Sequence, residues 1–215
     1  MTGSVAHVFT DRRHGDLSVA GDPVALAGRR SGIVDAPWTW LRQVHGTAVV
    51  TVTRPGEHAG SEADGAVTIE PDAPIAVQAA DCAPVLLVAD GGIGVAHAGW
   101  RGLLDGVVGA TADALTALGT APHTAILGPC IRGRCYEFGG ADLDRVVDRL
   151  GPAVRATTGW GTPAFDLAAG VAAACRDLGL ALEDSGTCTA CSPSHWSYRA
   201  RGEAGRQALV AWLEP

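Results

Sequence analysis

The sequence predicts a mixed α+β fold in a single domain over residues 1–215, and three observations support that prediction. Short β-rich runs are interspersed with stretches of helical periodicity, two of the runs form a hairpin pattern, and no linker, repeat or charge block divides the chain. Hydrophobic residues make up 47% of the chain, which is enough for a large core and excludes a disordered protein. Hairpins combined with segregated helices favour layered sheets over a purely βαβ winding.

The predicted strands are short apolar runs at 48–53, 75–80, 85–89, 93–97 and 125–127. Asp90, Gly91 and Gly92 separate the third run from the fourth, and this turn sequence predicts a hairpin over 85–97. The last run ends at Gly128 and Pro129, a pair typical of turns.

Helical periodicity predicts helices at 100–118, 141–150, 166–178 and 203–213. Gly119 follows the first of them and is a natural helix stop. In the third, Leu167, Val171, Cys175 and Leu178 share one face, so we interpret Cys175 as a small core residue without a chemical role.

Charge and composition exclude several classes of function. The chain has 16 Lys and Arg residues, all of them Arg, against 23 acidic residues, and its net charge is −7. Without lysine it has no Walker A phosphate loop and no Schiff-base nucleophile. A net-acidic chain without a basic block is also a poor candidate for binding nucleic acid or a membrane surface.

The sequence predicts a cytoplasmic protein. Residues 1–16 contain several charges and no continuous apolar stretch, so we expect no secretion signal. The longest apolar run, 83–89, is far shorter than the ~20 residues of a membrane helix. Six cysteines without an export signal indicate reduced thiols.

Two histidines and a cysteine are placed at the ends of predicted strands. His45 precedes the strand at 48–53, Cys82 precedes the hairpin, and His97 ends it. Such a trio can hold zinc and leave a fourth tetrahedral position for water or substrate. The spacing is not that of a zinc finger, and an open site on a rigid sheet is typical of catalysis.

Each of these residues also has a simpler interpretation, because a lone histidine or cysteine beside a strand is most often part of the core or its rim. Glycines flank both histidines and Asp81 precedes Cys82, which favours a functional site. On residue chemistry alone both interpretations stay open. Asp81 is the nearest carboxylate in sequence and is a candidate to shuttle a proton or orient a ligand.

A helix beginning at Trp100 offers unpaired N–H groups to an anion, and Arg101 can add a bidentate contact to phosphate. The alternative for Arg101 is an exposed arginine without a partner, and Arg12 and Arg13 are further candidates for phosphate binding. The remaining loop cysteines are Cys130, Cys135, Cys188 and Cys191. We interpret these four as local packing, with a disulfide or a remote metal ligand as the alternative.

Several motifs together resemble one known family. They are Gln43-Val44-His45-Gly46, Ala80-Asp81-Cys82, His97-Ala98-Gly99-Trp100-Arg101-Gly102, Gly128-Pro129-Cys130-Ile131, Cys135-Tyr136-Glu137-Phe138, Cys188-Thr189-Ala190-Cys191 and Ser197-Tyr198-Arg199. The family was once called multicopper polyphenol oxidases, or laccase-domain proteins, and is now described as purine nucleoside phosphorylases with adenosine deaminase activity. The resemblance covers nearly the whole chain.

The resemblance implies a four-layer αββα sandwich related to a cysteine-hydrolase-like fold, and one zinc held by His45, Cys82 and His97. It also implies phosphorolysis of adenosine, inosine, guanosine and 5′-methylthioadenosine, and deamination of adenosine. The expected partners are purine nucleosides and phosphate, with no nucleic acid and no membrane, and the chain is expected to be a monomer or homodimer.

The chain departs from the family pattern near its start. Residues 9–18 contain one glycine where relatives have a Gly-Gly pair, and the Asn-Leu-Gly that usually follows is missing. Substrate range or rate is therefore expected to differ from that of relatives.

Three other functions compete with this one. The first is a copper-dependent polyphenol oxidase. The lack of histidine-rich clusters argues against it, because several copper ions would require them. The second is a hydrolase or deamidase with Cys82 as nucleophile and His97 as base. The third is a domain that binds a ligand without turnover.

Overall fold

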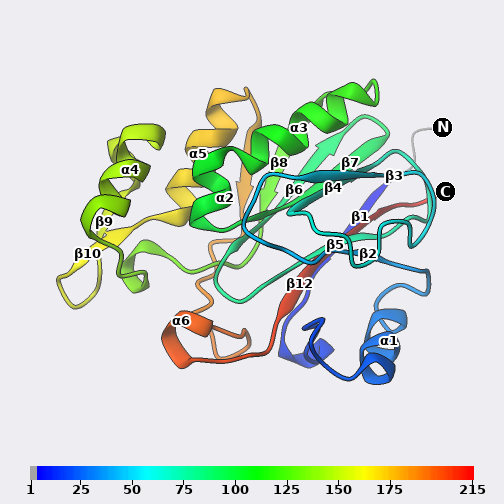
Figure 1. Cartoon of the computed structure of the whole chain (residues 1–215), viewed down its shortest axis with the longest axis horizontal. Coiled ribbons are helices and arrows are strands. Elements are labelled where there is room, and N and C mark those ends of the chain that lie inside the picture. Colours follow the sequence, from blue (N-terminus) through cyan, green and yellow to red (C-terminus); the bar gives the residue numbers. More distant parts are fainter. Residues whose placement is uncertain (1–3) are drawn as a thin grey trace.

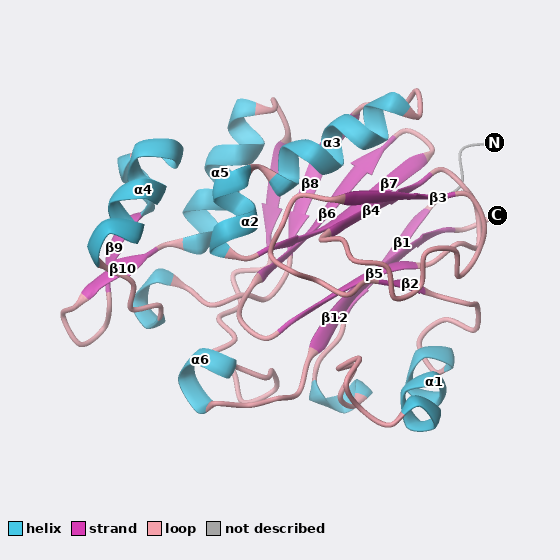
Figure 2. Cartoon of the chain, in the orientation of Figure 1, coloured by secondary structure: helices cyan, strands magenta, loops and turns pink. Residues whose placement is uncertain are grey.

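The computed structural model describes residues 4–215, and two β-sheets form its frame (Figures 1 and 2). The six-stranded sheet has the order β11 (Ala181–Asp184), β8 (Pro122–Leu127), β6 (Ala83–Ala89), β7 (Gly92–Ala98), β4 (Gly65–Thr68), β3 (Val49–Val52). The four-stranded sheet has the order β1 (Val5–Phe9), β12 (Gln207–Leu213), β5 (Ile75–Ala79), β2 (Thr39–Trp40). A separate hairpin pairs β9 (Arg155–Thr157) with β10 (Pro163–Phe165).

The α-helices are α1 (Pro23–Ser31), α2 (Trp100–Asp105), α3 (Val107–Ala117), α4 (Gly140–Leu150), α5 (Leu167–Asp177) and α6 (Tyr198–Arg201). Short 3-10 turns are η1 (Arg12–His14), η2 (Gly133–Cys135) and η3 (Pro152–Val154). Helices α2, α3 and α5 lie on one side of the paired sheets, and α1 lies on the opposite side (Figure 1).

The two sheets pack against each other through alternate residues of their strands. On β12, Leu209 and Leu213 enter the core between the sheets together with Val77 of β5 and Val95 of β7. The residue between them, Val210, packs instead in a cluster with Leu26 of α1. This alternation follows from the two-residue period of a strand, and it leaves both faces of the central strand β12 buried.

Most of the predicted elements are confirmed, the β6–β7 hairpin above all, whose register pairs Pro84 with His97. The predicted helix 100–118 begins at Trp100 as expected, but it is two helices. Gly106 separates them because it adopts a left-handed conformation with φ 97°, which ends α2.

The predicted helix at 203–213 is wrong, because residues 207–213 form strand β12. β12 lies between β1 and β5 and pairs antiparallel with both. A short apolar run fits a buried strand as well as a helix, and here the pairing on both sides decides the outcome.

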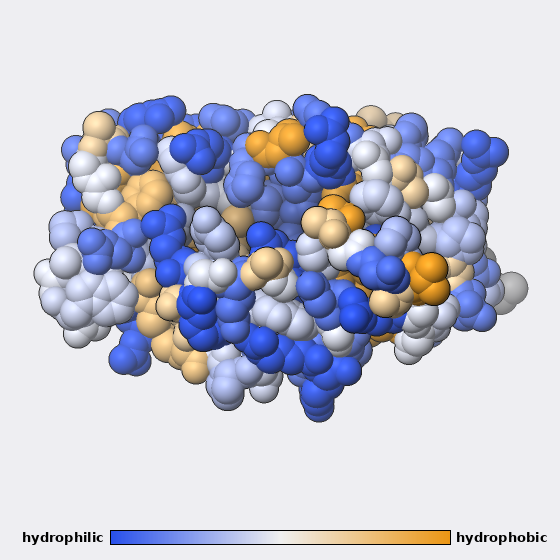
Figure 3. Space-filling model, turned by 60° about the horizontal axis from the view of Figure 1, so that its bottom comes forward, coloured by the Kyte–Doolittle hydropathy of each residue, from blue (hydrophilic) through white to orange (hydrophobic). Residues whose placement is uncertain are grey.

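The mixed α+β class is confirmed. The αββα sandwich and the cysteine-hydrolase-like fold are finer statements, and they stay predictions. Among the described residues, every helix is too short or too polar to cross a membrane. The face seen in Figure 3 is mainly hydrophilic, with its apolar residues scattered in small groups.

Candidate metal centre and its cavity

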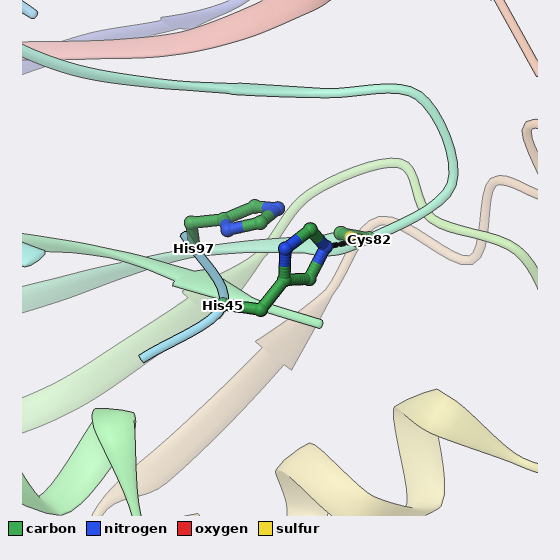
Figure 4. Close-up of side chains that lie close together, drawn as sticks. All are labelled: His45, Cys82 and His97. Carbon is green, nitrogen blue, oxygen red and sulfur yellow. Dashed lines mark hydrogen bonds between the residues drawn. The ribbon is translucent and has the colours of Figure 1, made fainter. Parts of the chain in front are cut away.

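His45, Cys82 and His97, remote in sequence, converge in the structure (Figure 4). One ligand atom from each lies within 4.8 Å of the other two. His45 Nε2 is 3.8 Å from Cys82 Sγ, and the two imidazole rings meet edge to face with centroids 4.9 Å apart. Burial increases along the series, from exposed His45 to half-buried Cys82 to buried His97.

The sheet explains why these side chains meet. The register of β6 with β7 pairs Ala83 with Ala98, so Cys82, just before β6, lies beside the end of β7 that carries His97. On the other side of β7, Gly65 of β4 pairs with Ala96, and this places Asp64 beside His97.

Asp64 is a completely buried carboxylate that ties the site together. Its Oδ1 lies 2.8 Å from His97 Nδ1, and the same oxygen accepts a hydrogen bond from the His45 amide at 3.0 Å. Its Oδ2 accepts the amides of Val44 and Gly46 at 3.1 and 2.8 Å. Burial raises the pKa of Asp64, but its bonds to His97 and to the two amides outweigh burial and hold the pKa below its usual range.

The bond to Asp64 also sets the tautomer of His97. A carboxylate only accepts hydrogen bonds, so Nδ1 of His97 carries a proton, and Nε2 is the nitrogen left for a metal ion, which would displace any proton there. A ligand histidine in a zinc site commonly has its second nitrogen bound to a carboxylate in this way.

Close approach to the centre requires two unusual backbone features. His45 adopts φ 62°, a left-handed conformation that a residue with a side chain rarely takes and that here coincides with the amide bonds to Asp64. Gly99 leaves room for the ring, since a Cβ at that position would lie 2.6 Å from His45 Cδ2 and 3.2 Å from Cys82 Sγ. The backbone conformation of His45 and the missing side chain at Gly99 therefore leave space around the three donor atoms.

The neighbouring charges also shift the pKa values of Cys82 and His97. Burial raises the pKa of Cys82, but the charge of His97 and hydrogen bonds from His45 and His97 lower it to about 6. Burial lowers the pKa of His97, but the Cys82 thiolate and Asp64 raise it to about 9. A thiolate is thus favoured at neutral pH, and the thiolate is the form of cysteine that binds metals.

The donor set fits a metal ion. Two imidazole nitrogens and a thiolate are the ligands that zinc takes in sites with an open fourth position. Across residues 4–215, the other group of suitable ligands consists of three cysteines, so this trio is the one metal-ligand group that contains histidine.

Asp81 adopts φ 95° and has both carboxylate oxygens engaged. Oδ1 accepts the hydroxyl of Thr189 at 2.6 Å, and Oδ2 accepts the amide of Arg199 at 2.7 Å. Thr189 and Arg199 had no predicted role, because contacts across more than 100 residues depend on topology.

The centre opens into a cavity of about 560 Å³, within the range of small-molecule sites. Aromatic rings of Trp100, Tyr136 and Tyr198 contribute to its lining. The predicted residue Arg101 also lines it, as does Arg199, and across residues 4–215 no carboxylate forms a salt bridge with either guanidinium.

The other two predicted phosphate-binding residues lie elsewhere. Arg12 is paired with Glu203 and stacks over the Trp196 ring. Arg13 is paired with Asp11 and is 85% exposed. Neither is among the residues that line the cavity.

Comparison with known proteins identifies the family. Residues 18–214 match the family described as multi-copper polyphenol oxidoreductase laccase. The chain belongs to this family. Its resemblance to laccase-domain proteins, first seen in the motifs, is thereby confirmed.

Similar sequences carry a different functional name. A purine nucleoside phosphorylase of Streptomyces griseus is 39% identical, over 100% of this chain and 96% of the relative. One of Mycobacterium tuberculosis is 38% identical, over 91% of this chain and 82% of the relative.

Solved structures share the fold. The Neisseria meningitidis protein NMB0706 has a TM-score of 0.86 and 27% identity, with 100% of this chain and 99% of that chain covered. YlmD from Geobacillus stearothermophilus has a TM-score of 0.86 and 25% identity, covering 100% and 93% respectively.

Replacing the buried carboxylate should weaken the centre. In Asp64→Asn, the amide removes the charge and presents a donor to groups that already donate. We expect metal affinity to fall about 10–100-fold and the free energy of unfolding to fall as well. Chelator competition and thermal unfolding measure the two effects, and unchanged metal affinity would contradict this role for Asp64.

A substitution that fills the space beside Gly99 tests the geometry of the site without changing any of its three metal-ligand residues. We expect Gly99→Ala to displace His45 and to reduce metal affinity about tenfold or more, since the new methyl group overlaps the ring. Gly109→Ala is the matched control, because a Cβ there meets nothing within 4 Å. Equal affinities of the two variants in chelator competition would show that the space beside Gly99 is unimportant.

Proposed function

We propose that this chain is a zinc-dependent purine nucleoside phosphorylase that also deaminates adenosine. The observation that carries the proposal is a cavity that joins three potential metal ligands to two arginines, neither of which has a carboxylate partner within residues 4–215. The names of the similar sequences support phosphorolysis. The substrate class is a purine nucleoside with phosphate as co-substrate, including adenosine, inosine, guanosine and 5′-methylthioadenosine.

Zinc is the metal that the donor set favours over a group of copper ions. Copper oxidases with several ions need many imidazole ligands, and the centre described here offers two. Zinc held by His45, Cys82 and His97 supplies Lewis acidity and a lowered pKa of water, the chemistry that loss of ammonia from C6 of adenosine requires.

Phosphorolysis requires a phosphate oxygen to reach C1′ of the ribose while the bond to the purine nitrogen breaks. The guanidinium groups of Arg101 and Arg199 offer paired N–H donors to hold the phosphate, which positions it for that attack. Trp100 and Tyr136 support these two arginines, since the guanidinium groups of Arg101 and Arg199 lie over their rings at 4.4 and 5.1 Å from the centroids. The exposed ring of Tyr198, which also lines the cavity, offers apolar surface on which a purine can stack. Because both of its oxygens are engaged, Asp81 is assigned an orienting role rather than proton transfer.

A second candidate is a cysteine-dependent hydrolase, because Cys82 contacts His97 and His97 contacts Asp64, the spatial arrangement of a nucleophile, a base and an orienting carboxylate. His45 argues against it. A hydrolase of this kind has no need of a second imidazole at the sulfur, nor of the positive φ that places it there.

Two substitutions separate these functions. We expect Cys82→Ala and His45→Ala both to lose bound zinc and most phosphate-dependent release of adenine from adenosine, because each removes one of three ligands. Zinc content and turnover of the purified chain are measured together. Full turnover in metal-free His45→Ala would favour the cysteine hydrolase, and oxygen uptake with a phenol would favour the copper oxidase.

The phosphate assignment has its own test. We expect Arg101→Ala to raise KM for phosphate about 10–100-fold, the effect of losing a charged hydrogen-bond donor, with a smaller change in KM for the nucleoside. Arg13→Ala is the matched control, since this exposed arginine lies outside the cavity lining. Similar KM values in both variants would remove Arg101 from phosphate binding.

A further inference from the structure

Outside the cavity that holds His45, a second cluster of chemically reactive side chains lies near the C-terminal loops. Cys135, Cys188 and Cys191 bring their sulfur atoms within 4.8 Å of one another, and Cys135 Sγ is 3.3 Å from Cys191 Sγ. Cys135 ends the η2 turn, while the other two lie between β11 and α6. The sequence left these cysteines interpreted as packing, with a disulfide or a metal ligand as the alternative.

Packing does not account for this arrangement. Cys175, by contrast, is a buried apolar residue of α5, as the sequence predicted. The clustered cysteines are only half-buried, or exposed in the case of Cys191, and their sulfurs contact one another. Cys135 also lines a cavity of about 590 Å³, so the cluster borders accessible space.

The loop around Cys188 carries two of the three sulfurs. Cys188-Thr189-Ala190-Cys191 has the two-residue spacing typical of metal-binding cysteine pairs. Ser192 donates its amide to the Cys188 carbonyl at 2.9 Å, a bond that folds this short segment back on itself. Both sulfurs of the pair thereby lie within 4.8 Å of the sulfur of Cys135, and the thiolate is the form of cysteine that binds a metal.

Both segments that carry the sulfurs are already held in place. Thr189 donates its amide to the Cys130 carbonyl at 3.1 Å, which joins the two loops. Arg201 donates to the carbonyl of Ala190 at 2.8 Å and to that of Thr189 at 3.3 Å. The three sulfurs are thus brought together before any ion binds, which lowers the cost of forming a site.

We propose that Cys135, Cys188 and Cys191 form a second metal site, which takes a zinc ion through three thiolates. The fourth position faces the cavity beside Cys135, where Arg199 offers positive charge near an anionic three-thiolate centre. Binding releases the remaining thiol protons to solvent. The assignment of this site does not rest on the nucleoside chemistry proposed above.

The second site has a structural consequence for the first. Thr189, between the two paired cysteines, donates its hydroxyl to Asp81, and Asp81 is the neighbour of Cys82. Arg199, which lines both cavities, donates its amide to the same carboxylate. An ion that fixes residues 188–191 therefore holds one wall of the first cavity.

Cobalt titration of the reduced full chain tests the proposal, because thiolate-to-cobalt charge transfer increases with the number of thiolate ligands. The background is Cys82→Ala, which removes the thiolate of the first site. We expect this chain to bind one Co²⁺ with the band intensity of three thiolates, and added Zn²⁺ to abolish the band. Adding Cys191→Ala should lower that intensity by about a third or more and weaken binding at least tenfold.

Cys175→Ala in the same background is the matched control, and it should leave the band unchanged. A Cys82→Ala chain with all remaining thiols free and no charge-transfer band overturns the proposal. So does a band that survives Cys191→Ala at full intensity. A Cys135–Cys191 disulfide that forms without added oxidant, shown by two missing free thiols and no bound metal, overturns it as well.

Discussion

The carboxylate of Asp64 is the group on which the candidate site depends. A buried carboxylate without partners costs several kcal/mol, and Asp64 offsets this cost with three amides and one imidazole. Those same bonds hold the left-handed backbone at His45 and select the tautomer of His97. One residue outside the donor trio thus places two of its three members.

The fold was predictable where turn and helix-cap residues in the sequence mark the ends of strands and helices. Turn glycines bound the β6–β7 hairpin, and helix α5 begins with Asp166 as N-cap, whose side chain accepts the amide of Ala169 at 3.1 Å. Strand β12 was not predictable, because its apolar residues face cores on both sides and lack a clear two-residue alternation. Only its partners β1 and β5, over 100 residues away in sequence, distinguish it from a helix.

The donor trio was predictable for a related reason. Cys82 lies directly before β6 and after Asp81, and His97 is the last residue but one of β7, so the hairpin brings these two to one edge. His45 lies beside Gly46 in the loop before β3. Asp64 had a weaker signal, because it is one of two acidic residues before the apolar strand β4 and nothing local relates it to His97. Arg199 was also not predictable from local sequence, because its place in the cavity depends on a hydrogen bond from its amide to the distant Asp81.

Asp81 connects the two cysteine-containing centres, and its geometry explains its presence better than proton transfer does. Its backbone has φ 95°, a conformation that costs energy and persists where surrounding contacts fix it. Thr189 and Arg199 supply those contacts through the carboxylate, while the Asp81 carbonyl accepts the amide of Ile131 at 2.9 Å. A side chain committed on both oxygens is poorly suited to exchanging protons with a substrate. It is well suited to holding Cys82 at a sharp bend, so Thr189 and Arg199 act together with the β6–β7 register to fix the position of the Cys82 sulfur.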